Sequence, residues 1–131
     1  MIVVDASVLV EVLSNDSPSA ALAWQAVRDD PEWASVGHLH AEVFSAVRGQ
    51  VLGGVLSARR AEASLSNLAA LSLLIVDTTL LLVRMWELRD NLTGYDAAYV
   101  AAAEALACPL VTADARLATA PGLRCEVRLA A

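Results

Sequence analysis

Short apolar runs are the clearest pattern along this chain. Three of them, residues 2–4, 73–76 and 109–112, show no regular alternation of apolar and polar positions, and each ends at or just before an aspartate. Such runs are typical of strands in a parallel sheet that is covered by helices on both faces. Residues 33–36 and 125–129 are weaker strand candidates, and the second alternates as an edge strand does. The pattern therefore predicts a mostly parallel sheet.

Helical periodicity fills the intervals between these strands, with apolar residues recurring three and four positions apart. Prolines and the pair Gly53–Gly54 fall near the expected boundaries, as helix and strand ends require. The predicted helices cover residues 6–14, 18–29, 39–53, 57–71, 78–90, 94–107 and 115–119. Strands and helices in alternation predict an α/β fold, a three-layer sandwich with a central, mostly parallel sheet.

Length and composition refine this prediction. A chain of 131 residues has the length of one ordinary domain, so we expect one domain over residues 1–131. Apolar residues make up 57% of the chain and aromatic residues 5%, which favours a core of Ala, Val and Leu. The longest apolar stretch, residues 68–83, is interrupted by polar residues, so no membrane span is predicted. The N-terminus lacks the basic segment of a signal peptide, and a cytoplasmic location is expected.

Charge and cysteine content exclude several classes of protein. The formal net charge is -6, all nine basic residues are arginine, and a broad basic surface for nucleic acid is therefore not expected. A polyanionic substrate would need positive charge supplied locally at the site. Cys108 and Cys125 adjoin apolar runs and show no metal-ligand spacing, which favours two reduced core thiols over a disulfide.

Two acids follow predicted strands. Asp5 comes directly after residues 2–4, and Asp114 follows the strand at 109–112. Each could simply cap the helix that begins next. Each also has a hydroxyl two residues away, on Ser7 and Thr112, that could orient a carboxylate or a water. Sites in open α/β sheets form beyond the carboxyl ends of strands, where the strand order reverses, so both acids are candidates.

Two further acids lie near apolar helix faces. Glu42 borders the apolar stripe of its helix, although a solvated flank position is the simpler interpretation. Asp96 shares a face with Tyr99 and several alanines, and it also completes a capping box with Thr93. Asp77 ends a strand too, but the sequence that follows it is typical of an ordinary cap, and we leave it out of the candidate site.

Convergence of these acids would require a cation. Four carboxylates within a few ångströms repel one another unless a positive ion neutralises them. Oxygen ligands alone favour Mg²⁺ or Mn²⁺, and a water bound to such an ion can attack a phosphodiester. His38 and His40 flank the start of the Glu42 helix, but no histidine-rich ligand set accompanies them, so we expect surface or supporting roles. No activated side-chain nucleophile and no phosphate-binding glycine loop is present.

The segments "MIVVDASVLVEVL", "AEVFSAVR" and "LTGYDAAYVAAAEALACPLVTADARL" resemble PIN-domain ribonucleases of the VapC toxin type, and the resemblance covers essentially the whole chain. It implies a Mg²⁺-dependent endoribonuclease that cleaves structured RNA such as tRNA, rRNA or mRNA, and that a VapB-type antitoxin holds inactive. It also implies a homodimer. The sequence departs from many relatives before the Glu42 helix, where Gly37 and His38 would reshape the approach to that glutamate.

The resemblance also implies roles for individual residues. The catalytic acids would be Asp5, Glu42, Asp96 and Asp114. Of these, Asp5, Asp96 and Asp114 would ligate the metal, while Glu42 would act through a water or as general base. Ser7 and Thr112 would orient water or ligands.

Partner and substrate contacts are predicted on the same basis. The antitoxin would insert a helix into a hydrophobic groove for which the candidates, with core packing as the alternative, are Leu9, Val10, Leu13, Trp24 and Val27. Arg116 is the first candidate for a phosphate contact, followed by Arg89 and Asn91.

Other functions fit the residues less well. A response-regulator receiver needs a late lysine, and this chain has none. DNA-directed nucleases of the same superfamily are longer and carry additional acids. The remaining alternative is a non-catalytic PIN-like domain that only binds a partner, and the presence of all four acids favours the nuclease.

Overall fold

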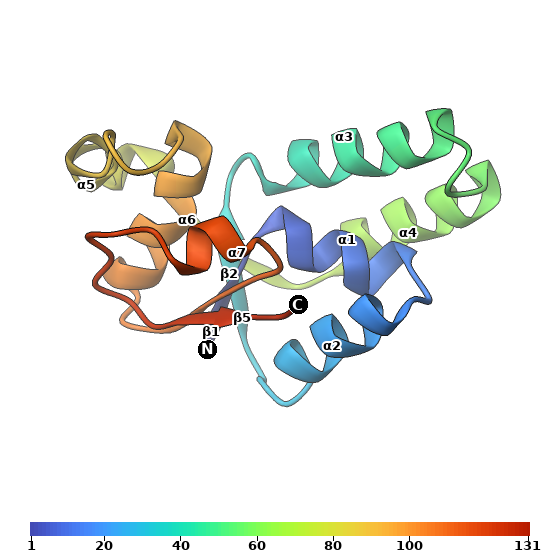
Figure 1. Cartoon of the computed structure of the whole chain (residues 1–131), viewed down its shortest axis with the longest axis horizontal. Coiled ribbons are helices and arrows are strands. Elements are labelled where there is room, and N and C mark those ends of the chain that lie inside the picture. Colours follow the sequence, from blue (N-terminus) through green and yellow to red (C-terminus); the bar gives the residue numbers. More distant parts are fainter.

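The computed structural model describes all 131 residues and contains one five-stranded sheet in which every neighbouring pair is parallel. The strand order is β3-β2-β1-β4-β5 (Figure 1). The strands are β1 (Ile2–Val4), β2 (Trp33–Val36), β3 (Leu73–Val76), β4 (Leu110–Thr112) and β5 (Val127–Leu129). The predicted α/β fold and parallel sheet are confirmed, and β5 lies at an edge as its alternating sequence indicated.

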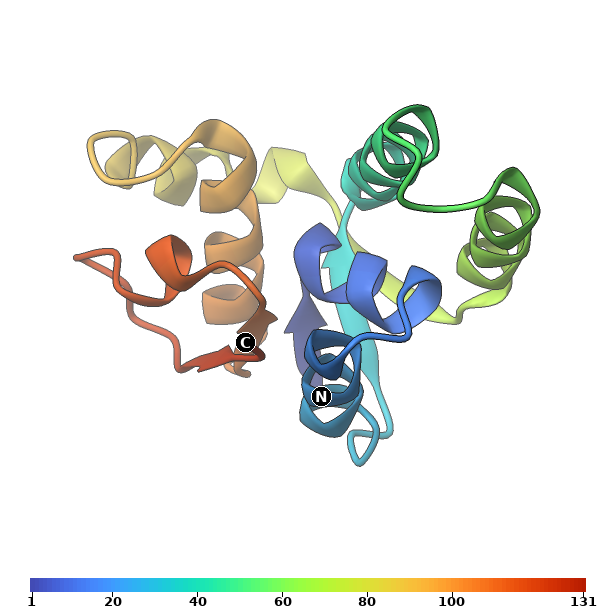
Figure 2. The same ribbon diagram turned by 45° about the vertical axis from the view of Figure 1, so that its right-hand side comes forward.

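Helices cover both faces of this sheet. They are α1 (Ala6–Ser14), α2 (Pro18–Val27), α3 (Leu39–Leu52), α4 (Ala58–Ala70), α5 (Leu82–Glu87), α6 (Gly94–Ala105) and α7 (Ala115–Ala118). Figure 2 shows α1 to α4 on one side of the sheet and α5 to α7 on the other. Side chains of the residues preceding α1, α2, α4, α6 and α7 accept hydrogen bonds from the first turns. Four of these helices begin where predicted, and α4 begins one residue later, because Ser57 is its cap.

The helix predicted over residues 78–90 is interrupted. A 3₁₀ turn, η1 (Thr78–Leu80), is followed by the six residues of α5, with Leu81 between them. The Asp77 carboxylate accepts a hydrogen bond from the Thr79 amide at 3.0 Å, which closes a tight turn at the end of β3. Asp77 is thus the cap that the sequence indicated. A continuous helix was wrong because this local turn competes with the α-helical ladder.

The apolar run at 73–76 is a strand but is not covered on both faces. β3 forms the sheet edge opposite β5, and its middle residues Leu74 and Ile75 are 50% and 41% exposed. The weaker sequence candidate, β2, lies next to β1 instead and is more deeply buried. Ser35 in β2 is tolerated there because its hydroxyl donates to the Val4 carbonyl at 2.8 Å.

The core is densest around β1 and α6. Residues 2–4 are fully buried, and so is the alanine-rich segment of α6 from residue 97 to 103. Small side chains let α6 pack closely on β1 and β2, which fixes where the first turn of α6 projects. No helix in the structure combines the length and the apolar composition that crossing a bilayer requires.

Candidate active site

The strand order reverses between β1 and β4, because the chain proceeds from β1 to β2 and β3 on one side and from β4 to β5 on the other. The helices that follow β1, β2 and β4 begin at the carboxyl ends of these strands, and α6 begins at the same end because it must return the chain to β4. Their N-terminal ends, which carry partial positive charge, therefore point to one region. This region contains Asp5, Glu42, Asp96 and Asp114.

Asp5 is the most buried of these acids, at 4% exposed. It caps α1 through Oδ1, which accepts hydrogen bonds from the Val8 amide at 3.1 Å and from the Ser7 hydroxyl at 2.6 Å. The Thr112 hydroxyl donates to the other oxygen, Oδ2. Burial raises the pKa of Asp5, against the opposing effect of these three hydrogen bonds. The charge of Asp96 raises it further.

The two predicted hydroxyls join the ends of β1 and β4. Ser7 Oγ accepts from the Ala113 amide at 2.9 Å, and Thr112 Oγ1 accepts from the Asp114 amide at 3.0 Å. Because each hydroxyl has one proton and a backbone amide already donates to its oxygen, that proton is directed to Asp5. The carboxylate is therefore fixed from both strands at once.

Asp96 lies in the first turn of α6, where its amide donates to the Thr93 hydroxyl at 3.2 Å, as the predicted cap requires. Its side chain borders a cavity of about 210 Å³. The residues around this cavity are Asn91, Leu92, Thr93, Asp96, Asp114, Arg116 and Leu117. Asp96, Asp114 and Arg116 thus line the same cavity.

Asp114 caps α7 and is paired with Arg116. Its Oδ1 accepts from the Arg116 amide at 2.9 Å, and the guanidinium lies 3.4 and 3.3 Å from its two carboxylate oxygens. The hydrogen bond from Arg116 is the main reason why the pKa of Asp114 lies below its ordinary value. The Arg116 side chain is 93% exposed, so the pair stands at the mouth of the cavity.

Glu42 lies in the first turn of α3 and is linked to the other acids through Tyr99. The Tyr99 hydroxyl donates to Glu42 Oε1 at 3.0 Å. Burial raises the pKa of Tyr99, and the charges of Glu42 and Asp5 both raise it further. The sequence interpretation treated Tyr99 as part of an apolar face. The sequence did contain a signal for this contact. A tyrosine on a helix face of alanines has a hydroxyl that needs a hydrogen-bond partner when the face is buried.

No three His, Cys, Asp or Glu side chains stand close enough to form a ready metal-binding group. In the structure Asp5 is directed at hydroxyls and Asp114 at Arg116. The chemistry of the donors nevertheless fits one kind of ion, since Asp5, Asp96 and Asp114 offer only carboxylate oxygens, as Mg²⁺ and Mn²⁺ prefer.

The two weaker candidates for a phosphate contact, Asn91 and Arg89, lie in different places. Asn91 borders the acidic cavity, and its amide donates to the Pro121 carbonyl. Arg89 lies outside the cavity, with its guanidinium 4.4 Å from the centre of the Trp86 ring.

For three of the five groove candidates on the first two helices, the structure shows the alternative, core packing. Leu9, Val10 and Val27 are buried, because α1 and α2 pack on each other and on the sheet. Of the remaining two, Leu13 is half-buried and Trp24 is exposed.

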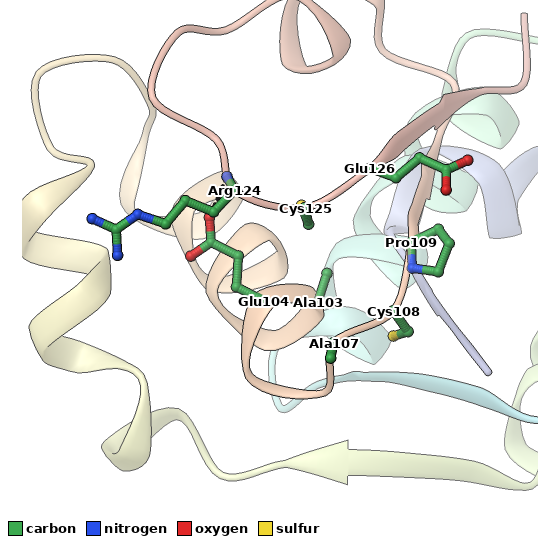
Figure 3. Close-up of a pocket in the computed structure, with 8 residues that line it drawn as sticks. All are labelled: Ala103, Glu104, Ala107, Cys108, Pro109, Arg124, Cys125 and Glu126. Carbon is green, nitrogen blue, oxygen red and sulfur yellow. Dashed lines mark hydrogen bonds between the residues drawn. The ribbon is translucent and has the colours of Figure 1, made fainter.

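A separate cavity of about 340 Å³ lies at the opposite end of α6 from Asp96. Figure 3 shows Cys108, which follows α6, and Cys125, which precedes β5, on its wall. Both are free thiols, half-buried rather than deep in the core, and burial raises the pKa of each. This cavity contains none of the four predicted acids.

Comparison with known proteins identifies the family. The sequence model of the PIN domain family matches residues 2–123. Ribonuclease VapC1 of Mycobacterium tuberculosis (strain ATCC 25618 / H37Rv) is 41% identical over 133 residues, which cover 97% of this chain and 96% of VapC1. Ribonuclease VapC12 of the same strain is 34% identical over 131 residues and the full length of both chains.

Solved structures agree on the fold. Mycobacterium tuberculosis VapC20, described as a Sarcin-Ricin loop cleaving toxin, superposes with a TM-score of 0.70 at 15% identity, over 90% of this chain and 93% of VapC20. VapBC2 from Rickettsia felis, solved bound to a DNA fragment from its promoter, gives 0.64 at 18% identity over 97% and 98%. The chain therefore belongs to the PIN-domain family and, within it, to the VapC ribonucleases of toxin–antitoxin systems.

Proposed function

We propose that this chain is a metal-dependent endoribonuclease toxin that cleaves structured RNA by hydrolysis and is neutralised by a VapB-type antitoxin. The observation that carries the proposal is the buried carboxylate of Asp5, oriented by Ser7 and Thr112 at the point of strand reversal and close to Asp96. A buried carboxylate with a raised pKa at such a position is typical of functional sites.

Asp5, Asp96 and Asp114 would hold the cation, which is Mg²⁺ or Mn²⁺ by the chemistry of its oxygen ligands. When bound, this ion would lower the pKa of a water and offset the charge of the phosphodiester. Local positive charge of this kind explains how a protein with a net charge of -6 binds RNA.

The protein's own side chains supply orientation and proton transfer. Ser7 and Thr112 keep both oxygens of Asp5 in fixed directions. Glu42 has one oxygen bound to Tyr99 and lies on a half-exposed side chain, so it can accept a proton from a water as general base. The exposed guanidinium of Arg116 can leave Asp114 for a phosphate oxygen of the substrate.

Cleavage of total host RNA tests the proposal. Purified protein with Mg²⁺ or Mn²⁺ should give discrete fragments, and EDTA should abolish them. Asp5→Asn and Asp96→Asn should each lower the rate at least about 100-fold, as expected for loss of a group that acts on the reacting atoms. Asp77→Asn is the matched control, because Asp77 also follows a strand but lies outside the site.

Two outcomes would contradict the nuclease proposal. Equal, metal-independent cleavage by the wild type, Asp5→Asn and Asp96→Asn would identify a contaminant. Folded protein that binds metal but cuts no RNA under any condition would favour the alternative, a non-catalytic domain that binds a partner.

The antitoxin is proposed to occupy an apolar groove between α3 and α4. This groove has a volume of about 240 Å³, and its apolar lining includes Phe44, Val51, Leu52 and Leu65. Phe44 and Leu52 are exposed although both are large and apolar. An amphipathic helix is the partner segment that such a groove accommodates.

Calorimetry with the VapB-type antitoxin encoded beside this chain tests the groove. Phe44→Arg should weaken binding at least roughly tenfold, or about 1.4 kcal/mol. Leu22→Arg, an exposed apolar position on α2, should leave the affinity unchanged. Equal affinity for Phe44→Arg and the wild type would place the antitoxin elsewhere.

A further inference from the structure

We propose that Tyr99 and His38 are positioning residues that hold Glu42 by one carboxylate oxygen and leave the other free for the reacting water. The inference rests on the proposed function, since it assigns how the general base of that reaction is oriented. It gives His38 a role in the site. It also means that α6 positions two acids, Asp96 directly and Glu42 through Tyr99.

Tyr99 provides a rigid donor. Its side chain is 1% exposed and its ring is fixed within the buried alanine face of α6. The hydroxyl donates to Glu42 Oε1 at 3.0 Å. Because burial and two nearby carboxylates raise its pKa, the phenol keeps its proton at any physiological pH. It is therefore always a donor, and Glu42 is its acceptor.

His38 approaches the same oxygen from the start of α3. Its Nε2 lies 2.9 Å from Glu42 Oε1, close enough for an ion pair, but the two atoms are not aligned as a hydrogen bond. The imidazole ring is held between two aromatic rings, with centroids 5.1 Å from Tyr95 and 5.1 Å from Tyr99, in edge-to-face arrangements. His38 is the residue that precedes α3, but its side chain makes no capping hydrogen bond to that helix. Helix capping therefore does not account for the position of the imidazole.

The two contacts have an asymmetric result. Glu42 Oε1 accepts the hydrogen bond from Tyr99 and lies within ion-pair distance of His38, whereas Oε2 takes part in no hydrogen bond within the protein. A carboxylate anchored at one oxygen has lost most of its rotational freedom and presents the second oxygen in a fixed direction. Such preorganisation speeds proton transfer without changing substrate binding.

Tyr99 also connects the acids through one helix. It lies three residues after Asp96, and positions three apart on a helix share a face. Movement of α6 would therefore displace Asp96 and the anchor of Glu42 together. This coupling explains why a tyrosine stands among the buried alanines of α6.

Cleavage kinetics in Mg²⁺ separate positioning from simple packing. Tyr99→Phe should lower kcat roughly tenfold, the size expected for one hydrogen bond to a charged group, and leave KM within about twofold. In a Glu42→Gln background, Tyr99→Phe should cause no further loss, because its effect passes through Glu42. His38→Ala should also lower kcat with KM little changed, because the imidazole stands 2.9 Å from the same Glu42 oxygen.

Ser64→Ala is the matched control for losing one buried hydroxyl. Ser64 donates to the Leu13 carbonyl at 2.8 Å, far from the acids, so its loss should lower the melting temperature without lowering kcat. The proposal is overturned if Tyr99→Phe and Ser64→Ala have the same effect on kcat. It is also overturned if the loss from Tyr99→Phe is undiminished in the Glu42→Gln background.

A crystal structure of Tyr99→Phe tests the inference without any activity. The Glu42 carboxylate should leave its present position or become disordered, whereas an unchanged, well-ordered Glu42 would overturn the positioning role. If the wild-type protein cuts no RNA with Mg²⁺ or Mn²⁺, the proposed nuclease function fails, and this structure still decides whether Tyr99 orients Glu42.

Discussion

At the scale of single residues, the decisive feature is that one carboxylate has two roles. Asp5 caps α1 through the Val8 amide, and it also receives hydroxyl protons from Ser7 and Thr112. The sequence offered capping and site chemistry as alternatives, and the geometry accommodates both because a carboxylate has enough lone pairs for several donors. Burial of such a group is unfavourable for its charged form, which has a measurable effect on stability.

Asp5→Asn should raise the melting temperature of the metal-free protein at neutral pH. The pKa of Asp5 is raised in the folded chain, so below the unfolded pKa its charge costs nothing, and the cost grows as pH rises through the folded value. Thermal unfolding in EDTA between about pH 4 and about pH 8 should show the variant's advantage growing with pH. A lower melting temperature than wild type at neutral pH would mean that the hydrogen bonds outweigh burial.

Thr112→Val should destabilise the fold by about 1–3 kcal/mol, because it leaves Asp5 Oδ2 and the Asp114 amide without their partner in a fully buried place. Urea denaturation measures the change. Thr112→Ser keeps the hydroxyl and should cost clearly less. Equal losses for the two variants would show that the methyl group, rather than the hydroxyl, matters at this position.

The residues of the site were predictable to different degrees, for a physical reason. Asp5 and Asp114 follow strands, and strand ends in a parallel sheet meet at one edge, so local sequence was enough. The hydrogen bond between Tyr99 and Glu42 joins residues 57 apart on two helices. Its existence depends on how closely α6 packs on the sheet, and no short stretch of sequence contains that information.

At the scale of secondary-structure elements, the short helix α5 depends on an ion pair. A six-residue helix is too short to be stable alone. Arg84 in α5 binds Glu104 in α6 with two hydrogen bonds, at 2.7 and 3.1 Å, and donates to the Gly122 carbonyl at 2.8 Å. One guanidinium therefore ties together α5, α6 and the loop that follows α7.

Glu104→Gln should lower the stability by about 1–3 kcal/mol at neutral pH, as loss of a hydrogen-bonded charge partner does. Burial tends to raise the pKa of Glu104, but hydrogen bonds from Arg84 and the Arg124 amide outweigh it, and the pKa lies below its ordinary value of 4.5. The stabilisation is thus present above that value and lost as pH falls through the folded pKa. Denaturation of both proteins at a series of pH values should show their difference vanishing in acid.

A difference between wild type and Glu104→Gln that does not change with pH would contradict the ionic origin of this contact. The control is Glu62→Gln, an exposed glutamate on α4 that makes no ion pair in the structure. It should leave the stability unchanged throughout.

Elements were predicted best where local sequence dominates and worst where neighbours decide. Helix starts were predictable because capping side chains act within three residues. The position of β3 in the sheet was not predictable, because a run of four apolar residues indicates a strand equally well at the centre of a sheet or at its edge. Exposure of Leu74 and Ile75 is decided by which strand pairs with β2 on its other side, and that is a property of the whole sheet.

At the scale of the whole molecule, apolar side chains remain exposed on α5 and the turn before it. Val83 is 78% exposed, and Leu80, Leu82 and Trp86 are exposed as well. An apolar group of this size on a small protein indicates an interaction surface. We propose that a second copy of the chain covers it, in keeping with the homodimer that the sequence resemblance implied.

Sedimentation should therefore show a dimer for the wild type and a monomer for Val83→Arg, which would place a charge within the apolar contact. Leu22→Arg, at an exposed apolar position on the opposite face of the sheet, should remain dimeric. A wild-type monomer at high protein concentration, or a dimer that survives Val83→Arg, would exclude α5 as the interface.

The hydrogen bond from Thr112 to Asp5 joins residues 107 apart, so the first acid of the chain is completed by one of its last strands. During synthesis on the ribosome, Asp5 emerges early but cannot be fixed from both sides until β4 has been made and has paired with β1. A growing or prematurely terminated chain therefore lacks an assembled site. Pairing of β4 with β1 is thus a folding step on which the fixed orientation of Asp5 depends.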